Sequence, residues 1–126
     1  MRLLPTLFCT AALGAAVLVS PVAHADQQLA ASICDYVAAN DRNRLRKVLS
    51  DYRLRLRNVY DGVVCNGESL IRHAFRSNAP DVGDFIARQL PGSQITDSGD
   101  IDWAIANGFA DSPLVESLRS RAGATD

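Results

Sequence analysis

The sequence lacks the short motifs that mark common enzyme families, and this absence narrows its chemistry. Its 126 residues contain no G-x-S-x-G, no H-E-x-x-H and no phosphate-binding P-loop. Histidine is also scarce, since His24 lies near the N-terminus and His73 is the only other one. A zinc site built from several histidines is therefore excluded, and we expect neither a metal nor a cofactor. We interpret His73 as a structural or surface residue, with a general base as the alternative.

The chain also has no large net charge of either sign. The formal net charge is −1 at pH 7, and aromatic residues make up 6% of the chain. Nucleic-acid-binding domains are usually basic overall, so we expect no nucleic-acid partner. The acidic stretch with Asp97, Asp100 and Asp102 lacks the twelve-residue loop ending in glutamate that binds calcium. These aspartates are therefore interpreted as loop and helix-cap residues.

Charged residues are absent from residues 3–19, where small and aliphatic side chains dominate. The Ala-His-Ala at residues 23–25 then supplies the small-x-small pattern that a signal peptidase reads. These features predict a secretory signal peptide at residues 1–25, cleaved after Ala25, and a periplasmic or secreted protein. A membrane anchor is the weaker alternative because the apolar run is only about 17 residues long. A lipoprotein is disfavoured because Cys9 precedes the hydrophobic segment.

Only two cysteines remain once the predicted signal peptide is removed. Cys34 and Cys65 remain, and two cysteines in an exported chain most simply form one disulfide. A bridge closing a loop of about thirty residues would stabilise the fold by roughly 3–4 kcal/mol. The alternatives are a redox-active pair, which the absence of C-x-x-C disfavours, and two unpaired thiols.

Positive charge is concentrated in one segment of the chain. Residues 42–57 hold seven basic side chains against one acid, Asp51, whereas residues 81–126 are predominantly acidic. Arginine favours bidentate contact with carboxylate or phosphate, so this asymmetry predicts a surface for an anionic partner. The candidate residues are Arg53, Arg55, Arg57, Arg46, Arg42 and Tyr60. A solvated helix face, with arginine favoured by codon composition, is the alternative.

Apolar residues recur at helical spacing through most of the chain. This periodicity predicts helices within residues 27–37, 45–52, 71–75, 82–90, 101–105 and 114–118. Asn40-Asp41 and Ser69 are placed to cap the second and third of them. Pro91-Gly92 is interpreted as the end of the fourth.

In the segment between the second and third predicted helices, the apolar residues recur with a different spacing. Leu54 and Leu56 alternate with arginines, which favours an extended conformation, with a continuation of the second helix as the alternative. Asp61-Gly62 is a turn signal, and residues 63–65 would form a short returning strand. We therefore expect an extended or hairpin-like connector at residues 53–65.

Three helix–turn–helix units share a spacing. An aliphatic residue is followed three positions later by a second core residue and four positions after that by asparagine or glycine, in the triplets Ile33-Tyr36-Asn40, Ile71-Ala74-Asn78 and Ile101-Ala104-Gly108. This pattern resembles the ankyrin repeat, although the spacing between units is irregular. Trp103 and Phe109 flank the last turn and are interpreted as core residues rather than a binding platform. The expected fold is mainly α, an ankyrin-like stack of about three helical hairpins in one domain at residues 26–121, with a frayed tail at residues 122–126.

The segment from residue 31 to residue 79 also resembles a family of small exported bacterial proteins, the domain-of-unknown-function family 3718. The shared features are Cys34, the Tyr-Val-Ala-Ala-Asn-Asp step at residues 36–41, the Arg-Leu-Arg at residues 44–46, residues 57–61 and the Cys-Asn-Gly at residues 65–67. The resemblance implies export and a paired cysteine framework, but it implies no activity.

These observations together predict an exported, non-enzymatic binding protein. Its expected partner is an unknown protein or an anionic envelope component such as lipid phosphate or glycan, and no transmembrane anchor would remain after signal cleavage. The alternatives are a small periplasmic enzyme or enzyme inhibitor, centred on His73, and an envelope-stability factor without a discrete ligand.

Overall fold

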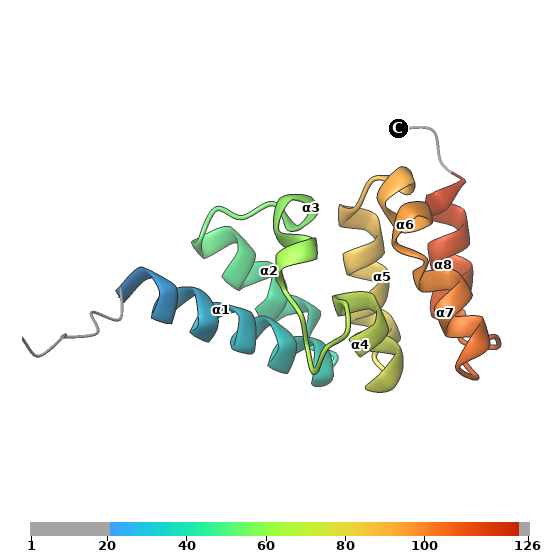
Figure 1. Cartoon of the computed structure of the whole chain (residues 1–126), viewed down its shortest axis with the longest axis horizontal. Coiled ribbons are helices and arrows are strands. Elements are labelled where there is room, and N and C mark those ends of the chain that lie inside the picture. Colours follow the sequence, from blue (N-terminus) through green and yellow to red (C-terminus); the bar gives the residue numbers. More distant parts are fainter. Residues whose placement is uncertain (1–20, 124–126) are drawn as a thin grey trace, which may run out of the picture.

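The computed structural model describes the backbone of residues 21–123 and the side chains from residue 27 onward (Figure 1). This part of the chain is mainly α-helical, as the periodicity predicted. Its helices are α1 (Pro21–Ala38), α2 (Arg42–Asp51), α3 (Leu56–Val59), α4 (Leu70–Arg76), α5 (Pro80–Gln89), α6 (Gly92–Ser98), α7 (Asp100–Ala106) and α8 (Pro113–Ala122), with a 3₁₀ turn η1 (Tyr60–Gly62) after α3.

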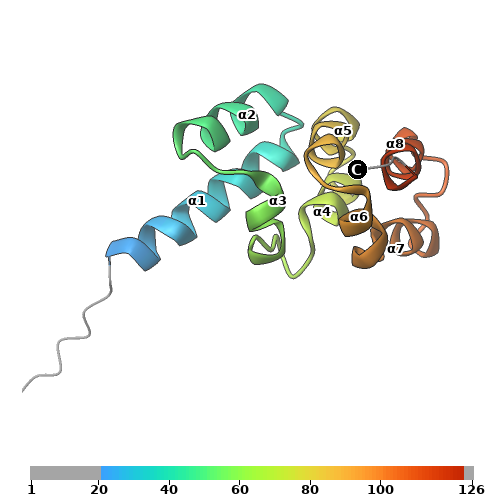
Figure 2. The ribbon, with the colours of Figure 1, turned by 90° about the horizontal axis from the view of Figure 1, so that it is seen from above.

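Three helical hairpins form the frame of the fold. They are α1 with α2, α4 with α5, and α7 with α8, and each is the pair predicted from the repeated spacing. Helices α1, α4 and α7 pack side by side in one layer, while α2, α5 and α8 pack side by side in the other (Figure 2). The hairpin prediction is thereby confirmed, but a specifically ankyrin-like stack stays a prediction.

The hairpin turns lie at the three positions that the spacing identified. Asn40, Asn78 and Gly108 all have positive φ, at 55°, 51° and 90°. This left-handed region is favourable for glycine and more accessible to asparagine than to most other residues. Asn40 also joins two hairpins, because its Oδ1 accepts a hydrogen bond from the backbone N–H of Val82 in α5 at 3.0 Å. The predicted caps are present too, since Asp41 and Ser69 accept hydrogen bonds from the first turns of α2 and α4.

The expected extended connector at residues 53–65 is wrong in its central part. The α2 helix closes through a hydrogen bond from Leu54 N–H to Leu49 C=O at 2.8 Å, and the chain turns at Arg53, where φ is 53°. The chain then forms α3 and η1, which bury Leu56 and Tyr60 in the core. The expected strand is reduced to an isolated bridge between Cys65 and Glu68. Burial of these two side chains in a compact helical turn outweighs the local alternation of arginine and leucine.

The α6 helix was not predicted. Pro91-Gly92 was interpreted only as the end of a helix, but Pro91 also stands at the N-cap of α6. The helix buries Ile95 and packs against α8. Arg121 of α8 strengthens this junction, because its Nε donates a hydrogen bond to the carbonyl oxygen of Leu90 at 2.8 Å.

The ends of the predicted domain differ slightly from the structure. Helix α1 begins at Pro21, so it includes the predicted cleavage position after Ala25, and the rest of the predicted signal peptide lies outside the described residues. Helix α8 continues to Ala122, one residue into the predicted tail, and residues 124–126 lie outside the described part. None of the described helices is both long and apolar enough to cross a membrane.

The α1 helix packs on the body mainly through its C-terminal half. Ile33 and Val37 are fully buried against α2 and α4, whereas Leu29 and Ala30 are only partly covered. The N-terminal half projects beyond the other helices (Figures 1 and 2). One face of this projecting helix is consequently left beside α3 and η1 without a complete covering layer.

Candidate functional site

The arginines predicted to face a partner lie on one end of the fold. Arg42 and Arg46 are one turn apart on α2, beside Leu49 of the same helix, which is buried together with Leu45. Both arginines are exposed. The Arg46 guanidinium carbon lies 5.9 Å from the centre of the Phe85 ring in α5, a cation–π contact that holds this side chain along the surface.

Arg53 and Arg55 continue this basic surface through the segment between α2 and α3, and Arg57 continues it within α3. All three are exposed, whereas the alternating Leu54 is half-buried and Leu56 is buried. The alternation of arginine and leucine therefore separates outward from inward side chains, although the backbone is not a strand. We call the five exposed arginines the arginine surface; they are Arg42, Arg46, Arg53, Arg55 and Arg57.

The arginine surface makes no ion pair within residues 27–123. By contrast, six other basic side chains of that part are paired with carboxylates, namely Arg44, Lys47, Arg72, Arg76, Arg88 and Arg119. Five like charges on one end of a small domain produce a positive potential that attracts anions and weakens with added salt.

Tyr60 does not belong to this surface, and its inclusion was wrong. Its side chain is only 3% exposed, and its hydroxyl donates a hydrogen bond to Asp100 Oδ2 at 2.8 Å. The same hydroxyl accepts a hydrogen bond from Ile71 N–H at 3.3 Å. Burial and the neighbouring Asp100 carboxylate raise the pKa of Tyr60, so the hydroxyl keeps its proton. The exposed aromatic beside the arginines is Tyr52, the last apolar residue of the helix predicted within residues 45–52; it follows the last residue of α2 and is 59% exposed.

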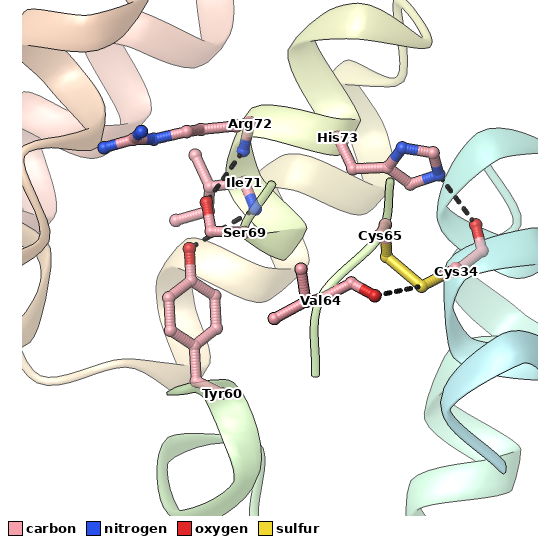
Figure 3. Close-up of a disulfide and its surroundings, with 8 residues drawn as sticks. All are labelled: Cys34, Tyr60, Val64, Cys65, Ser69, Ile71, Arg72 and His73. Atoms are coloured by element: carbon pink, nitrogen blue, oxygen red, sulfur yellow. Dashed lines mark hydrogen bonds between the residues drawn. A yellow bond between two sulfur atoms is a disulfide. The ribbon is translucent and has the colours of Figure 1, made fainter. Parts of the chain in front are cut away.

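Asp100 is the centre of a buried polar cluster that the sequence did not reveal. It is 1% exposed, and besides Tyr60 it accepts hydrogen bonds from Ser69 Oγ at 3.1 Å and from Arg72 Nε at 2.7 Å. Arg72 also donates to the carbonyl oxygen of Ser98 at 3.2 Å. Tyr60, Ser69, Ile71 and Arg72 lie close together in Figure 3. Asp100 was interpreted as a loop or helix-cap acid, and it is indeed the first residue of α7, but its burial was not expected. Its contacts are those of a structural anchor that joins η1, α4 and α7.

The disulfide between Cys34 and Cys65 is present, as predicted. It ties α1 to the segment that follows η1, and His73 lies beside it (Figure 3). The Nε2 of His73 donates a hydrogen bond to the carbonyl oxygen of Cys34 at 3.1 Å. His73 thus helps to hold α4 against α1, which agrees with its structural interpretation.

Trp103 and Phe109 pack beside the core, as expected, while remaining partly exposed. Their ring centres are 5.7 Å apart, and each also contacts Phe75. The guanidinium carbons of Arg72 and Arg76 lie 5.3 Å and 5.0 Å from the centre of the Trp103 ring. These contacts cover the aromatic cluster with side chains from α4.

Two grooves flank the arginine surface and meet at Leu54. The α2–α5 groove has a volume of about 460 Å³, and its walls include Arg42, Arg46 and the ion pair between Asp84 and Arg88. The α1–α3 groove has a volume of about 400 Å³. It is lined by Leu29, Ala30, Ile33, Leu54, Val59 and Val63, with Asn58 and Gly62 completing its wall. The first groove therefore combines charged side chains with apolar ones such as Leu49 and Phe85, while the second is mainly apolar.

Comparison with known proteins places these features in a family. The family described as "Protein of unknown function (DUF3718)" matches residues 33–97, which include both cysteines and the whole arginine surface. No curated protein and no solved structure matches the chain. Because the family match covers more than half of the 126 residues, the chain belongs to the DUF3718 family.

Proposed function

We propose that this chain is an exported, non-enzymatic binding protein of the bacterial envelope whose arginine surface holds an anionic partner. The observation that carries the proposal is the contrast in ion pairing. Five exposed arginines share one end of the fold without a carboxylate partner in residues 27–123, while six other basic side chains are paired. Guanidinium groups bind carboxylate and phosphate through planar, bidentate hydrogen bonds, so an anionic partner is the natural complement.

The backbone at Arg53 supports the proposal independently. Arg53 has a φ of 53°, a left-handed conformation that costs a non-glycine residue about 1–2 kcal/mol. Glycine is the usual residue at such a helix terminus. Arg53 adopts this unfavourable conformation although its side chain is exposed. This is consistent with a side chain that contacts a partner rather than one that stabilises the fold.

Replacing Arg53, Arg55 and Arg57 together with alanine should lower recovery of the partner from envelope extract about tenfold. Each exposed charge contact contributes on the order of 0.5 kcal/mol, and three of them account for the expected change. The measurement is a quantitative pull-down with wild-type and variant protein. Replacing the same three arginines with lysine keeps the charge but removes the bidentate geometry, so recovery should lie between those of the wild type and the triple alanine variant.

A matched variant, Arg119→Ala, removes one exposed and already paired charge from α8 and should leave recovery unchanged. Circular dichroism of every variant establishes that the fold is intact. Equal recovery with wild type and the triple alanine variant would contradict a binding role for this segment.

The disulfide supports the exported location, because such bonds persist in oxidising compartments. Intact mass spectrometry of the protein recovered from the periplasm or medium should give a chain that begins at Asp26. Its mass should be about 2 Da below that of the reduced form, because one disulfide bond removes two hydrogen atoms. A chain retaining residues 1–25, or found only in the cytoplasm, would contradict the proposed export.

A further inference from the structure

The α1–α3 groove is the most apolar of the recesses near the arginine surface. One wall is the face of α1 with the partly covered Leu29 and Ala30 and the buried Ile33, and the opposite wall is formed by Val59 and Val63 around η1. Its volume of about 400 Å³ lies within the range of small-molecule sites, roughly 300–1,000 Å³. An apolar group of that size would therefore be well accommodated.

Exposed arginines are direct chain neighbours of two residues that line this groove. Leu54 lines the groove, and its two chain neighbours are the exposed Arg53 and Arg55. Asn58 also lines it and follows the exposed Arg57. An apolar recess whose lining residues alternate in sequence with exposed arginines that form no ion pair within residues 27–123 is complementary to a molecule with an apolar chain and an anionic head.

We infer that the α1–α3 groove binds the acyl chain of a single-chain anionic amphiphile, with the carboxylate or phosphate of its head held by Arg53, Arg55 and Arg57. This inference rests on the proposed function and specifies the chemistry of the anionic partner. Fatty-acid carboxylates and lysophospholipids share this chemistry.

A bilayer surface fits the same region less well. Stable attachment to a bilayer requires several exposed apolar side chains that enter it. Around the arginine segment, the large exposed hydrophobic residues are Tyr52 and Val64 alone within the described chain. The apolar area available here is recessed in the groove, which favours an individual acyl chain over insertion into a membrane.

Isothermal titration calorimetry with carboxylates of eight, ten and twelve carbons, used as monomers, provides the test. The protein is purified from cells that express the full sequence. Affinity should increase about fourfold with each methylene that enters the groove. Lauroyl lysophosphatidylglycerol should bind as well, whereas the uncharged monolauroylglycerol should bind at least tenfold more weakly than dodecanoate.

Gly62 offers a way to fill the groove without removing a core side chain. It lines the groove, and a Cβ added there would meet no heavy atom within 4 Å. Gly62→Leu should therefore fold normally and weaken dodecanoate binding at least tenfold. Ala106→Leu is the matched control, since Ala106 is exposed on α7 at the far end of the stack (Figure 1), and it should bind like the wild type.

The possible outcomes separate this inference from the proposed function. If glycerol phosphate binds through the arginines but neither chain length nor Gly62→Leu matters, the acyl site is overturned while anion binding stands. If dodecanoate binds equally well to the Arg53/Arg55/Arg57→Ala variant, the proposed arrangement of head and chain is overturned.

Binding to phosphatidylglycerol vesicles without binding to a monomeric amphiphile would indicate that the region contacts a membrane surface, and it would overturn the inference too. A dimer in light scattering that Gly62→Leu dissociates would assign the groove to a second copy and overturn it.

Discussion

Replacing Asp100 with alanine should lower the free energy of unfolding by about 3–5 kcal/mol, the usual cost of removing one partner from a buried ion pair. The carboxylate is 1% exposed and is the shared acceptor of Tyr60, Ser69 and Arg72. Its removal leaves the Arg72 charge, whose side chain is only 29% exposed, without a counter-ion. A domain of this size is stable by about 5–15 kcal/mol in total, so the expected loss is a large fraction.

Asp102→Ala is the matched control for this prediction. Asp102 lies in the same first turn of α7, carries the same charge and is exposed, so its removal tests charge and helix position without the buried contacts. We expect a change within about 0.5 kcal/mol, as for most surface substitutions. Urea unfolding followed by circular dichroism measures both variants. Losses of similar size would show that the buried cluster contributes little beyond its formal charge.

A double-mutant cycle separates the hydroxyl of Tyr60 from the rest of the cluster. Tyr60→Phe removes the donor to Asp100 Oδ2, and the cycle with Asp100→Ala should show a coupling energy of about 1–3 kcal/mol. The raised pKa of Tyr60 sets the pH window. The hydroxyl keeps its proton in the folded state but loses it in the unfolded chain above about pH 10, so the tyrosine's contribution to stability is lost as pH rises beyond that value.

The local features of the fold were accessible from the sequence because local chemistry determines them. Turns at Asn40, Asn78 and Gly108 require residues that tolerate positive φ, and the sequence supplies asparagine or glycine at each. The caps at Asp41 and Ser69 follow from the same short-range logic. The disulfide followed from counting cysteines in a chain expected to be exported.

The polar cluster around Asp100 and the positions of Tyr52 and Tyr60 could not be predicted from the sequence, because contacts between distant residues determine them. Tyr60 and Asp100 are separated by 40 residues, and no local pattern indicates that they meet. Tyr52 continued the apolar period of α2, but the helix ends at Asp51 and the turn at Arg53 directs the chain away. The arginines could be predicted as exposed because a charged guanidinium is costly to bury, whereas the absence of ion pairs to them within residues 27–123 depends on tertiary packing.

Removing the disulfide should lower the free energy of unfolding by about 3–4 kcal/mol. Cys34 and Cys65 are separated by 31 positions, and freeing a loop of that length returns roughly this much conformational entropy to the unfolded chain. The variant is Cys34→Ala combined with Cys65→Ala, which avoids leaving an unpaired thiol. Urea unfolding of the wild type should shift by a similar amount under reductant, while the double variant should not respond. If mass spectrometry shows that the wild type is fully reduced, and its free energy of unfolding equals that of the oxidised protein, this account is contradicted.

The same bond is expected to matter for the α1–α3 groove, because it joins the two walls of that groove. Ile33 precedes Cys34 on the α1 wall, and Val63 lies two residues before Cys65 on the opposite wall. Without the bond, α1 keeps its contacts with α2 and α4, but its projecting half is no longer held at a fixed distance from η1. The folded double alanine variant should therefore bind dodecanoate several-fold more weakly, and titration well below its unfolding temperature measures this. Unchanged affinity in that variant would mean that helix packing alone positions the walls and that the disulfide acts only on stability.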